Sequence, residues 1–243
     1  MPEAVNPKPL SLVDGRLPRL LQVLWPPRCL VCGERGDRGR DLCRSCAGAL
    51  PWLRTACPTC ALPLPMPASA CGACLRRAPP LAAVHAAFVY ARPLDRLLPR
   101  FKFHGDLAAG RLLSQLLADA CADWTHPAAL VPIALHRARL RQRGYDQALE
   151  LARPLARWHG VALRPELLVR HRPTAAQSVQ SDANARRRNL RDAFTVPVGV
   201  ALPAHVTLVD DVMTTGATLH AAAKALRRAG VARVDAWVCA RVP

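Results

Sequence analysis

The chain of 243 residues has little lysine, few acidic residues and few aromatic side chains. Lysine occurs only at Lys8, Lys102 and Lys224, and aromatic residues make up 5% of the sequence. Arginine therefore carries most of the formal net charge of +17. Because arginine binds planar anions bidentately, the charge favours phosphorylated small molecules or nucleic acid as ligands. A compositional bias that leaves most arginines on solvated faces is the alternative. The scarcity of aromatic residues argues against a platform on which bases stack.

The sequence also lacks an apolar run near the roughly 18 residues that a membrane span needs. Its first residues do not combine a cationic segment with an apolar one, as a secretory signal does. With 51% hydrophobic residues, the chain has enough apolar surface for a folded core. We therefore expect a cytoplasmic protein without a membrane span, built from one large domain or two small ones.

Cysteine is abundant, and eight of the ten cysteines form four C-x2-C pairs whose first members are 14 residues apart. Each pair can turn two thiolates toward one ion, and two pairs complete a tetrahedral zinc site. Disulfides are the alternative, but the paired spacing and the absence of a signal sequence disfavour them. The predicted metal ligands are Cys29, Cys32, Cys43, Cys46, Cys57, Cys60, Cys71 and Cys74.

The segment that holds these pairs has few large apolar side chains, so bound metal must supply its folding free energy. We therefore expect two structural Zn²⁺ ions with closed coordination. The spacing leaves two arrangements open: a sequential one, which joins neighbouring pairs, and an interleaved one, which joins the first pair to the third. Cys121 and Cys239 fall in apolar patterns, and we expect them to be buried without metal.

Strand-like and helix-like patterns alternate after residue 80, and this alternation predicts an α/β fold with an open, mostly parallel sheet. In such sheets ligands bind outside the carboxyl ends of the strands. We expect strands at 84–90, 129–133, 166–170, 205–209 and 232–240, helices at 107–124, 147–158 and 217–229, and a basic loop at 137–144. The expected domains are an N-terminal extension with a helix near 17–24 (1–28), a double zinc-binding module (29–75) and the α/β domain (81–243).

One segment predicts a site for a phosphorylated sugar. A strand ends in two adjacent acids, Asp210 and Asp211, and a threonine-rich turn then opens a helix. Gly216 lets the backbone approach an anion, while helix N–H groups and threonine hydroxyls donate hydrogen bonds to it. The two carboxylates suit vicinal sugar hydroxyls, directly or through Mg²⁺. An ordinary capped strand–turn–helix is the alternative. The predicted phosphate-binding residues are Thr214, Thr215, Gly216, Ala217 and Thr218.

This segment resembles the phosphoribosyl-pyrophosphate (PRPP) motif of type I phosphoribosyltransferases. Three further blocks, FKFHGD at 101–106, VPI…RQRGYDQ within 131–147 and QS…RRNL…F within 177–194, are similar to blocks of the ComF family. That family joins a double zinc ribbon to a type I phosphoribosyltransferase-like domain, and the resemblance covers residues 17–241. Asp146 departs from the asparagine of many members, which leaves its hydrogen bonds to be determined.

The resemblance implies that PRPP binds with Mg²⁺. Asp210 and Asp211 would be the catalytic pair on the ribose hydroxyls. Residues Thr214–Thr218, here called the threonine loop, would hold the 5′-phosphate. A loop near 171–191 would close over the site. The arginines beyond the strand at 129–133 would neutralise pyrophosphate; they are Arg137, Arg141 and Arg143, together with Arg139.

Three functions follow from these features. The first is a glycosyltransferase that transfers a pentosyl group, as in nucleotide salvage, although no residue identifies the acceptor and turnover is left open. The second, which the family resemblance implies, is a role in DNA uptake during natural transformation, with single-stranded DNA on the basic stretch 137–191. The third is a catalytically silent PRPP sensor or adaptor whose zinc ribbons bind a DNA-uptake helicase or another protein.

Overall fold

The computed structural model describes residues 26–171 and 193–243. The chain divides into two compact units, Met1–Ala49 and Leu50–Pro243. The helix expected near 17–24 lies outside the described residues, as does the loop expected at 171–191 except for its first residue. In the two described ranges, no helix has the length and apolar character that crossing a membrane requires.

The first unit contains the turn of the first C-x2-C pair (Cys29–Glu34), here called the first knuckle, and the short helix α2 (Arg44–Gly48). The knuckle closes through hydrogen bonds from the Cys29 N–H to the Glu34 carbonyl (2.7 Å) and from the Gly33 N–H to the Cys29 carbonyl (2.8 Å). Gly33 takes a φ of +82°, a left-handed conformation that glycine adopts readily. Helix α2 begins after Cys43, so its first turn presents Cys46 close to Cys43.

The second unit is built on a five-stranded sheet in the order β1-β7-β6-β2-β3, in which every neighbouring pair is parallel. The strands are β1 (Val84–Val89), β2 (Ala129–Pro132), β3 (Ala162–Leu163), β6 (His205–Met213) and β7 (Arg233–Arg241). All carboxyl ends therefore meet at one edge of the sheet, where parallel α/β folds bind ligands. The predicted α/β fold with a mostly parallel sheet is confirmed.

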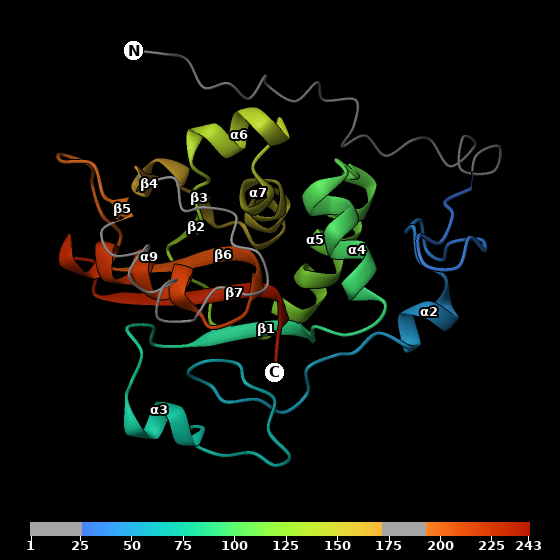
Figure 1. The fold of residues 1–243 in the computed structure, drawn as a ribbon, viewed down its shortest axis with the longest axis horizontal. Helices are drawn as coiled ribbons and strands as arrows, with labels where there is room; N and C mark the ends of the chain where they lie inside the picture. Colours follow the sequence, from blue (N-terminus) through green and yellow to red (C-terminus); the bar gives the residue numbers. More distant parts are fainter. Residues whose placement is uncertain (1–25, 172–192) are drawn as a thin grey trace. The chain divides into compact units, whose positions relative to one another are not determined.

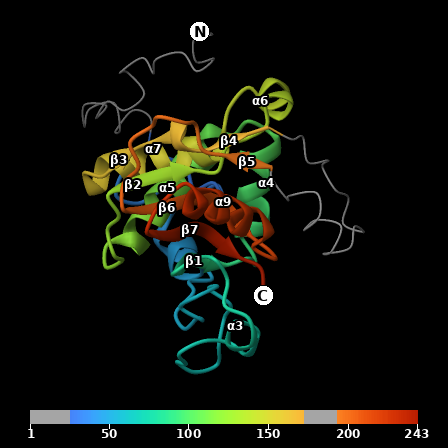
Figure 2. The same cartoon turned by 90° about the vertical axis from the view of Figure 1, so that its left-hand side faces the viewer.

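Helices cover both faces of this sheet (Figures 1 and 2). Helices α5 (Leu107–Cys121) and α7 (Gln147–His159) pack against each other and against one face, while α9 (Ala217–Arg228) packs against β6 and β7 on the other. The leucines of the apolar stripe of α5, such as Leu113 and Leu117, are buried, as their helical spacing predicts.

The segments 137–144 and 166–170 differ from the sequence predictions. The basic segment expected as a loop is helix α6 (Arg137–Arg143), which His136 caps and Gly144 ends at a φ of +79°. Its arginines favour a helix without producing an apolar stripe, so periodicity did not reveal it. The strand expected at 166–170 is instead a 3-10 turn (Pro165–Leu167) and the short strand β4 (Val169–Arg170), which pairs antiparallel with β5 (Phe194–Thr195).

Residues 50–76, here called the second ribbon, pack against strand β1 and include helix α3 (Gly72–Arg76). The Leu53 N–H donates to the Ala87 carbonyl, and the Val89 N–H donates to the Pro51 carbonyl, both at 2.9 Å. The rings of Trp52 and Phe88 lie 4.5 Å apart. Because β1 is an edge strand, these contacts satisfy backbone groups that would otherwise remain unpaired.

Candidate functional site: two zinc centres and the carboxyl edge of the sheet

The eight paired cysteines form two four-cysteine groups in sequential order. Within each group the sulfur atoms lie within 4.8 Å of one another. The Cys32 and Cys43 sulfurs are 3.7 Å apart, and the Cys60 and Cys71 sulfurs are 3.6 Å apart. A tetrahedron of Zn–S bonds of about 2.3 Å has edges of about 3.8 Å, whereas a disulfide needs about 2.05 Å. Both groups therefore fit a structural zinc ion.

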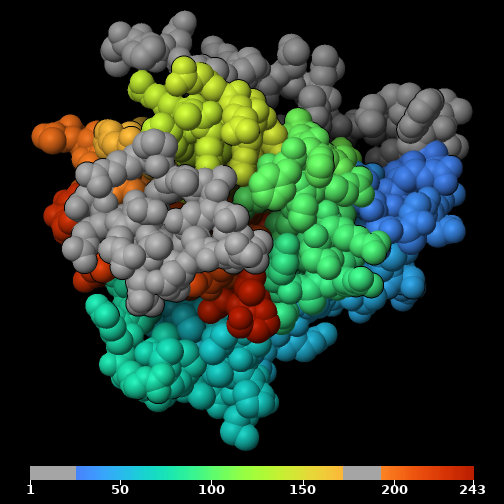
Figure 3. Space-filling model, viewed as in Figure 1, coloured from blue at the N-terminus to red at the C-terminus, as the bar shows by residue number. Residues whose placement is uncertain are grey.

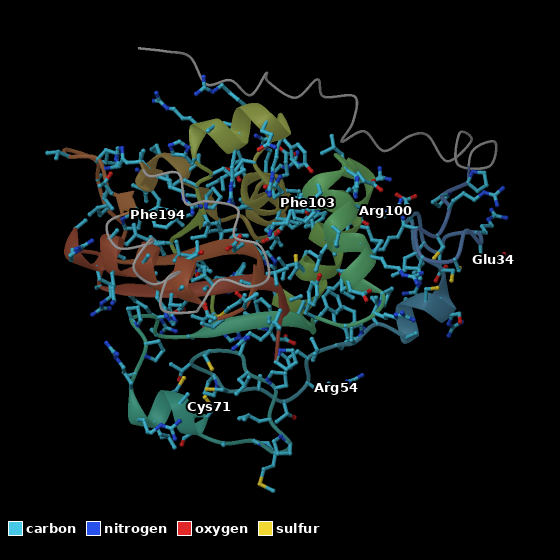
Figure 4. The ribbon with its side chains drawn as sticks, in the orientation of Figure 1. Glu34, Arg54, Cys71, Arg100, Phe103 and Phe194 are labelled. Atoms are coloured by element: carbon cyan, nitrogen blue, oxygen red, sulfur yellow. The ribbon has the colours of Figure 1, made fainter. Side chains whose placement is uncertain are left out.

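Backbone N–H groups support the sulfur atoms of both groups. The Cys46 N–H donates to the Cys43 sulfur (3.4 Å), and the Cys71 N–H donates to the Cys57 sulfur (3.2 Å). Sulfur atoms of the second group gather beside α3 (Figure 4). Cys121 and Cys239 are fully buried, burial raises the pKa of both thiols, and neither belongs to a metal-ligating group of the described residues.

The two predicted acids lie near the carboxyl end of β6, which continues past them to Met213. Asp211 is buried, with 4% of its surface exposed, whereas Asp210 is partly exposed. The Asp211 N–H donates to a carboxylate oxygen of Asp210 at 2.9 Å. Burial and the neighbouring charge of Asp211 raise the pKa of Asp210. Two adjacent carboxyl groups in such surroundings favour a cationic partner, because both resist ionising together.

Lys102 supplies such a cation, and the sequence reasoning missed it. Its Nζ lies 2.7 Å from Oδ2 of Asp211. Burial opposes the charged form, but Asp211 and Asp210 together raise the pKa of Lys102, so the ammonium stays charged. The residue is on α4 (Leu94–Phe103), a helix that contains Pro99 and was not predicted. The available signal was its rarity, since it is one of three lysines in the chain.

Packing around Phe101 fixes the position of Lys102. The Tyr145 hydroxyl donates a hydrogen bond to the Phe101 carbonyl, and the two rings lie 5.7 Å apart. Gly110 of α5 faces the Phe101 ring so closely that a Cβ there would lie 2.4 Å from Phe101 Cε2. Phe101 itself is fully buried. The close approach of α4 and α5 therefore depends on glycine at position 110.

We expect Gly110→Ala to destabilise the protein, because the added methyl group must displace the Phe101 ring. The cost of such overpacking is about 1–3 kcal/mol, reduced by the gain of about 1 kcal/mol from alanine in a helix. Urea unfolding measures the change. Gly72→Ala in α3 is the matched control, since its Cβ would meet nothing nearer than Arg76 Nη1 at 3.9 Å. Equal stability of the two variants would contradict the prediction.

The threonine loop connects β6 to α9 at the same edge of the sheet. Gly216 has a φ of +74°, a left-handed conformation that glycine adopts readily, and a Cβ there would lie 2.5 Å from Met213 Cε, which would have to move. Thr214 and Thr215 are exposed, and the Thr215 hydroxyl accepts a hydrogen bond from the Ala217 N–H at 3.4 Å. The N-terminus of α9 carries a partial positive charge that favours an anion.

The predicted arginines occupy different positions on or near α6. Arg137 and Arg141 are exposed, whereas Arg143 is partly buried. Arg143 donates to Gln147 at 2.8 Å and lies 5.2 Å from the ring centroid of Phe103 (labelled in Figure 4). Of these three arginines, Arg143 acts on Lys102, where its like charge lowers the pKa.

Arg170 is a second cation that the sequence reasoning missed. It is 9% exposed, and its guanidinium lies 5.3 Å from the ring centroid of Phe194. Burial and the charge of Arg139 lower the pKa of Arg170, while Asp210 and Asp146 act in the opposite direction. The predicted strand at 166–170 contains Arg170, but its antiparallel pairing with β5 was not predicted, so the sequence gave no signal for this position.

Asp146 joins two segments through backbone hydrogen bonds. One carboxylate oxygen accepts from the Leu149 N–H and caps α7, while the other accepts from the Leu135 N–H, both at 3.1 Å. Burial raises the pKa of Asp146, and these N–H groups oppose that shift. Because a carboxylate presents two acceptor oxygens and an asparagine side chain only one, aspartate suits this position.

Zinc ribbons together with an open parallel sheet that carries an acid pair and a threonine loop define a zinc-ribbon protein with a parallel α/β domain. The double zinc ribbon domain matches residues 20–75. Over 219 residues the chain is 34% identical to DNA utilization protein YhgH of Escherichia coli (strain K12), covering 88% of this chain and 89% of that protein. The chain belongs to the ComF family.

Two competence proteins are also similar to this chain. Competence protein F of Haemophilus influenzae is 39% identical over 160 residues, which cover 63% of this chain and 69% of that protein. Competence protein ComFC of Streptococcus pneumoniae is 26% identical over 156 residues, which cover 64% of this chain and 67% of that protein.

Proposed function

We propose that this chain binds PRPP with Mg²⁺ at the carboxyl end of β6 and acts in DNA uptake. The observation that carries the proposal is the placement of the acid pair, the Gly216 turn and Lys102 at one edge of the sheet. The names of the relatives, Competence protein F, ComFC and DNA utilization protein, support the role in DNA uptake.

Each group at this edge has a distinct part in binding. Asp210 and Asp211 would hold the ribose hydroxyls and Mg²⁺, for which carboxylate oxygens are suitable ligands. The Thr214–Thr218 backbone and hydroxyls would hold the 5′-phosphate. Lys102, Arg143 and Arg170 would neutralise the pyrophosphate group. Mg²⁺ would supply charge neutralisation between the carboxylates and the phosphate oxygens.

Transfer of the ribosyl group is a further step that the same residues can serve. When pyrophosphate leaves, positive charge develops on the ribose ring, and nearby carboxylates stabilise it electrostatically. Arginine and lysine stabilise the departing anion. No described side chain is identified as the base that activates an acceptor. We therefore propose that the chain binds PRPP, and that the bound PRPP has one of two uses, transfer of its ribosyl group or ligand sensing.

Calorimetry with PRPP, with and without Mg²⁺, tests the binding. A pyrophosphate-release assay with purine, pyrimidine and DNA acceptors then separates the two uses. Binding with release identifies a phosphoribosyltransferase. Binding without release for any acceptor identifies a sensor or adaptor. A wild-type protein that binds no PRPP in either condition contradicts the proposal.

Single-stranded DNA should bind with little sequence preference, because exposed arginines contact phosphates rather than base edges. Log affinity should fall as log salt rises, by about 0.7 per phosphate neutralised. Replacing the exposed Arg137 and Arg141 with glutamine should flatten this slope by up to about 1.4 if both contact phosphate. Arg92→Gln with Arg96→Gln, at exposed positions outside the basic stretch, is the matched control.

Fluorescence anisotropy over a salt series measures the slope. Equal slopes for both double variants and the wild type would move the contact away from α6. The triplet Arg186, Arg187 and Arg188 lies outside the described residues and is a separate set for the same assay. No binding at low salt would contradict the DNA contact altogether.

A further inference from the structure

Arg241 connects the second zinc centre to the strand that carries the proposed ligand site. It is the last residue of β7 and stands in register with Met213 of β6 and Val89 of β1. Its side chain is 9% exposed. The guanidinium Nε donates to the Cys60 carbonyl at 3.0 Å, and Nη1 donates to the Met213 carbonyl at 3.3 Å. One side chain thus contacts both sites.

The zinc side of this contact is electrostatic as well as geometric. Four thiolates and one Zn²⁺ carry a formal charge of about −2, which a nearby cation offsets. The hydrogen bond to the Cys60 carbonyl places the Arg241 guanidinium beside one of these ligands. Arginine keeps its charge in proteins. The second ribbon lies against the C-terminal residues of β7 in Figure 3.

The ligand side of the contact is Met213, the residue before the threonine loop. Its carbonyl accepts from Arg241 and also from the Val242 N–H at 3.0 Å. Its Cε occupies the space beside Gly216, where a Cβ would lie 2.5 Å away. Because Met213 directly precedes the loop, a shift of its backbone would displace the start of the loop.

We propose that Arg241 is a positioning residue that couples the second zinc ion to the threonine loop. Zinc held by the second cysteine group fixes the Cys60 carbonyl, this carbonyl orients Arg241, and Arg241 holds Met213 where the loop can bind phosphate. The inference rests on the proposed PRPP site. By linkage, loss of this zinc weakens PRPP binding, and bound PRPP raises the affinity for this zinc by the same factor.

The chain contains its own control, because the first cysteine group lies in the other compact unit. Isotope-coded alkylation during zinc chelation, followed by mass spectrometry, reports the two groups separately. With PRPP and Mg²⁺ present, alkylation of the second group should slow by about fivefold or more while the first group is unaffected. Equal protection of both groups, or of neither while PRPP is bound, would overturn the coupling.

Arg241→Lys keeps the charge but loses the planar fork that reaches two carbonyls. This variant should retain both zinc ions, lose the protection by PRPP and bind PRPP about tenfold more weakly, which corresponds to about 1.4 kcal/mol. A merely structural role would lower the unfolding temperature without removing the selective protection. Retained protection in the variant would overturn the assignment.

Hydrogen exchange separates failure of the coupling from failure of the PRPP site, since it needs no ligand. Removing zinc from the wild type should speed exchange of the Thr214–Leu219 amides, while the amides of β2 keep their rates. In Arg241→Lys the same amides should exchange faster even with zinc bound. Unchanged rates in the zinc-free wild type would overturn the coupling, whether or not calorimetry detects PRPP binding.

Discussion

Removal of zinc is expected to unfold the first unit while leaving the parallel sheet of the second unit folded. Of the apolar residues in 26–49, only Cys29 and Leu42 are buried core residues, so this segment cannot fold by burial alone. A structural zinc ion supplies about 10–16 kcal/mol of folding free energy in such modules. The sheet has an extensive apolar core around β6 and β7, so we expect it to stay folded without metal.

Elemental analysis should give two zinc ions per chain, and hydrogen exchange after chelation should show full exchange in residues 26–49 with protected amides in β6 and β7. Cys121→Ala with Cys239→Ala is the control, because both cysteines lie in the core away from the zinc ligands. That variant should still bind two zinc ions. A wild-type protein with one zinc ion, or none, would contradict the double-ribbon structure.

Replacing both acids of the pair is expected to have the largest effect on PRPP affinity. Asp210→Asn with Asp211→Asn removes the charges that would hold Mg²⁺ and the ribose hydroxyls, and it leaves Lys102 without its carboxylate partner at 2.7 Å. Each lost charge-assisted hydrogen bond costs about 1.5–3 kcal/mol. The double variant should therefore bind PRPP at least about tenfold more weakly in calorimetry.

The matched control is Asp235→Asn on the adjacent strand β7. Asp235 is also buried, but it pairs with His205 (2.8 Å) and Arg233 (3.0 Å) near the amino end of the sheet. Its replacement should reduce stability and leave PRPP affinity unchanged. If the Asp210–Asp211 double variant, folded by circular dichroism, binds PRPP like the wild type, these acids are not part of the ligand site.

Much of the candidate site could be predicted from the sequence because its chemistry is contiguous. A C-x2-C pair brings two ligands together within one turn, so the eight zinc ligands follow from local spacing. The acids and Gly216 likewise share one strand–turn–helix segment, and alternating patterns predicted the parallel sheet that gives this segment its position. In these cases the residues that act together are neighbours along the chain.

Only the tertiary structure decided which distant residues meet at these sites. The cysteine spacing allowed two pairings of the knuckles, and the packed ribbons have the sequential one. Lys102 reaches Asp211 because α4 packs on α5 through Phe101 and Gly110, and Arg241 reaches Cys60 because β7 lies beside both β1 and β6. Periodicity reports the face on which a residue lies within its own element, whereas these contacts depend on strand order and helix packing, which no local pattern contains.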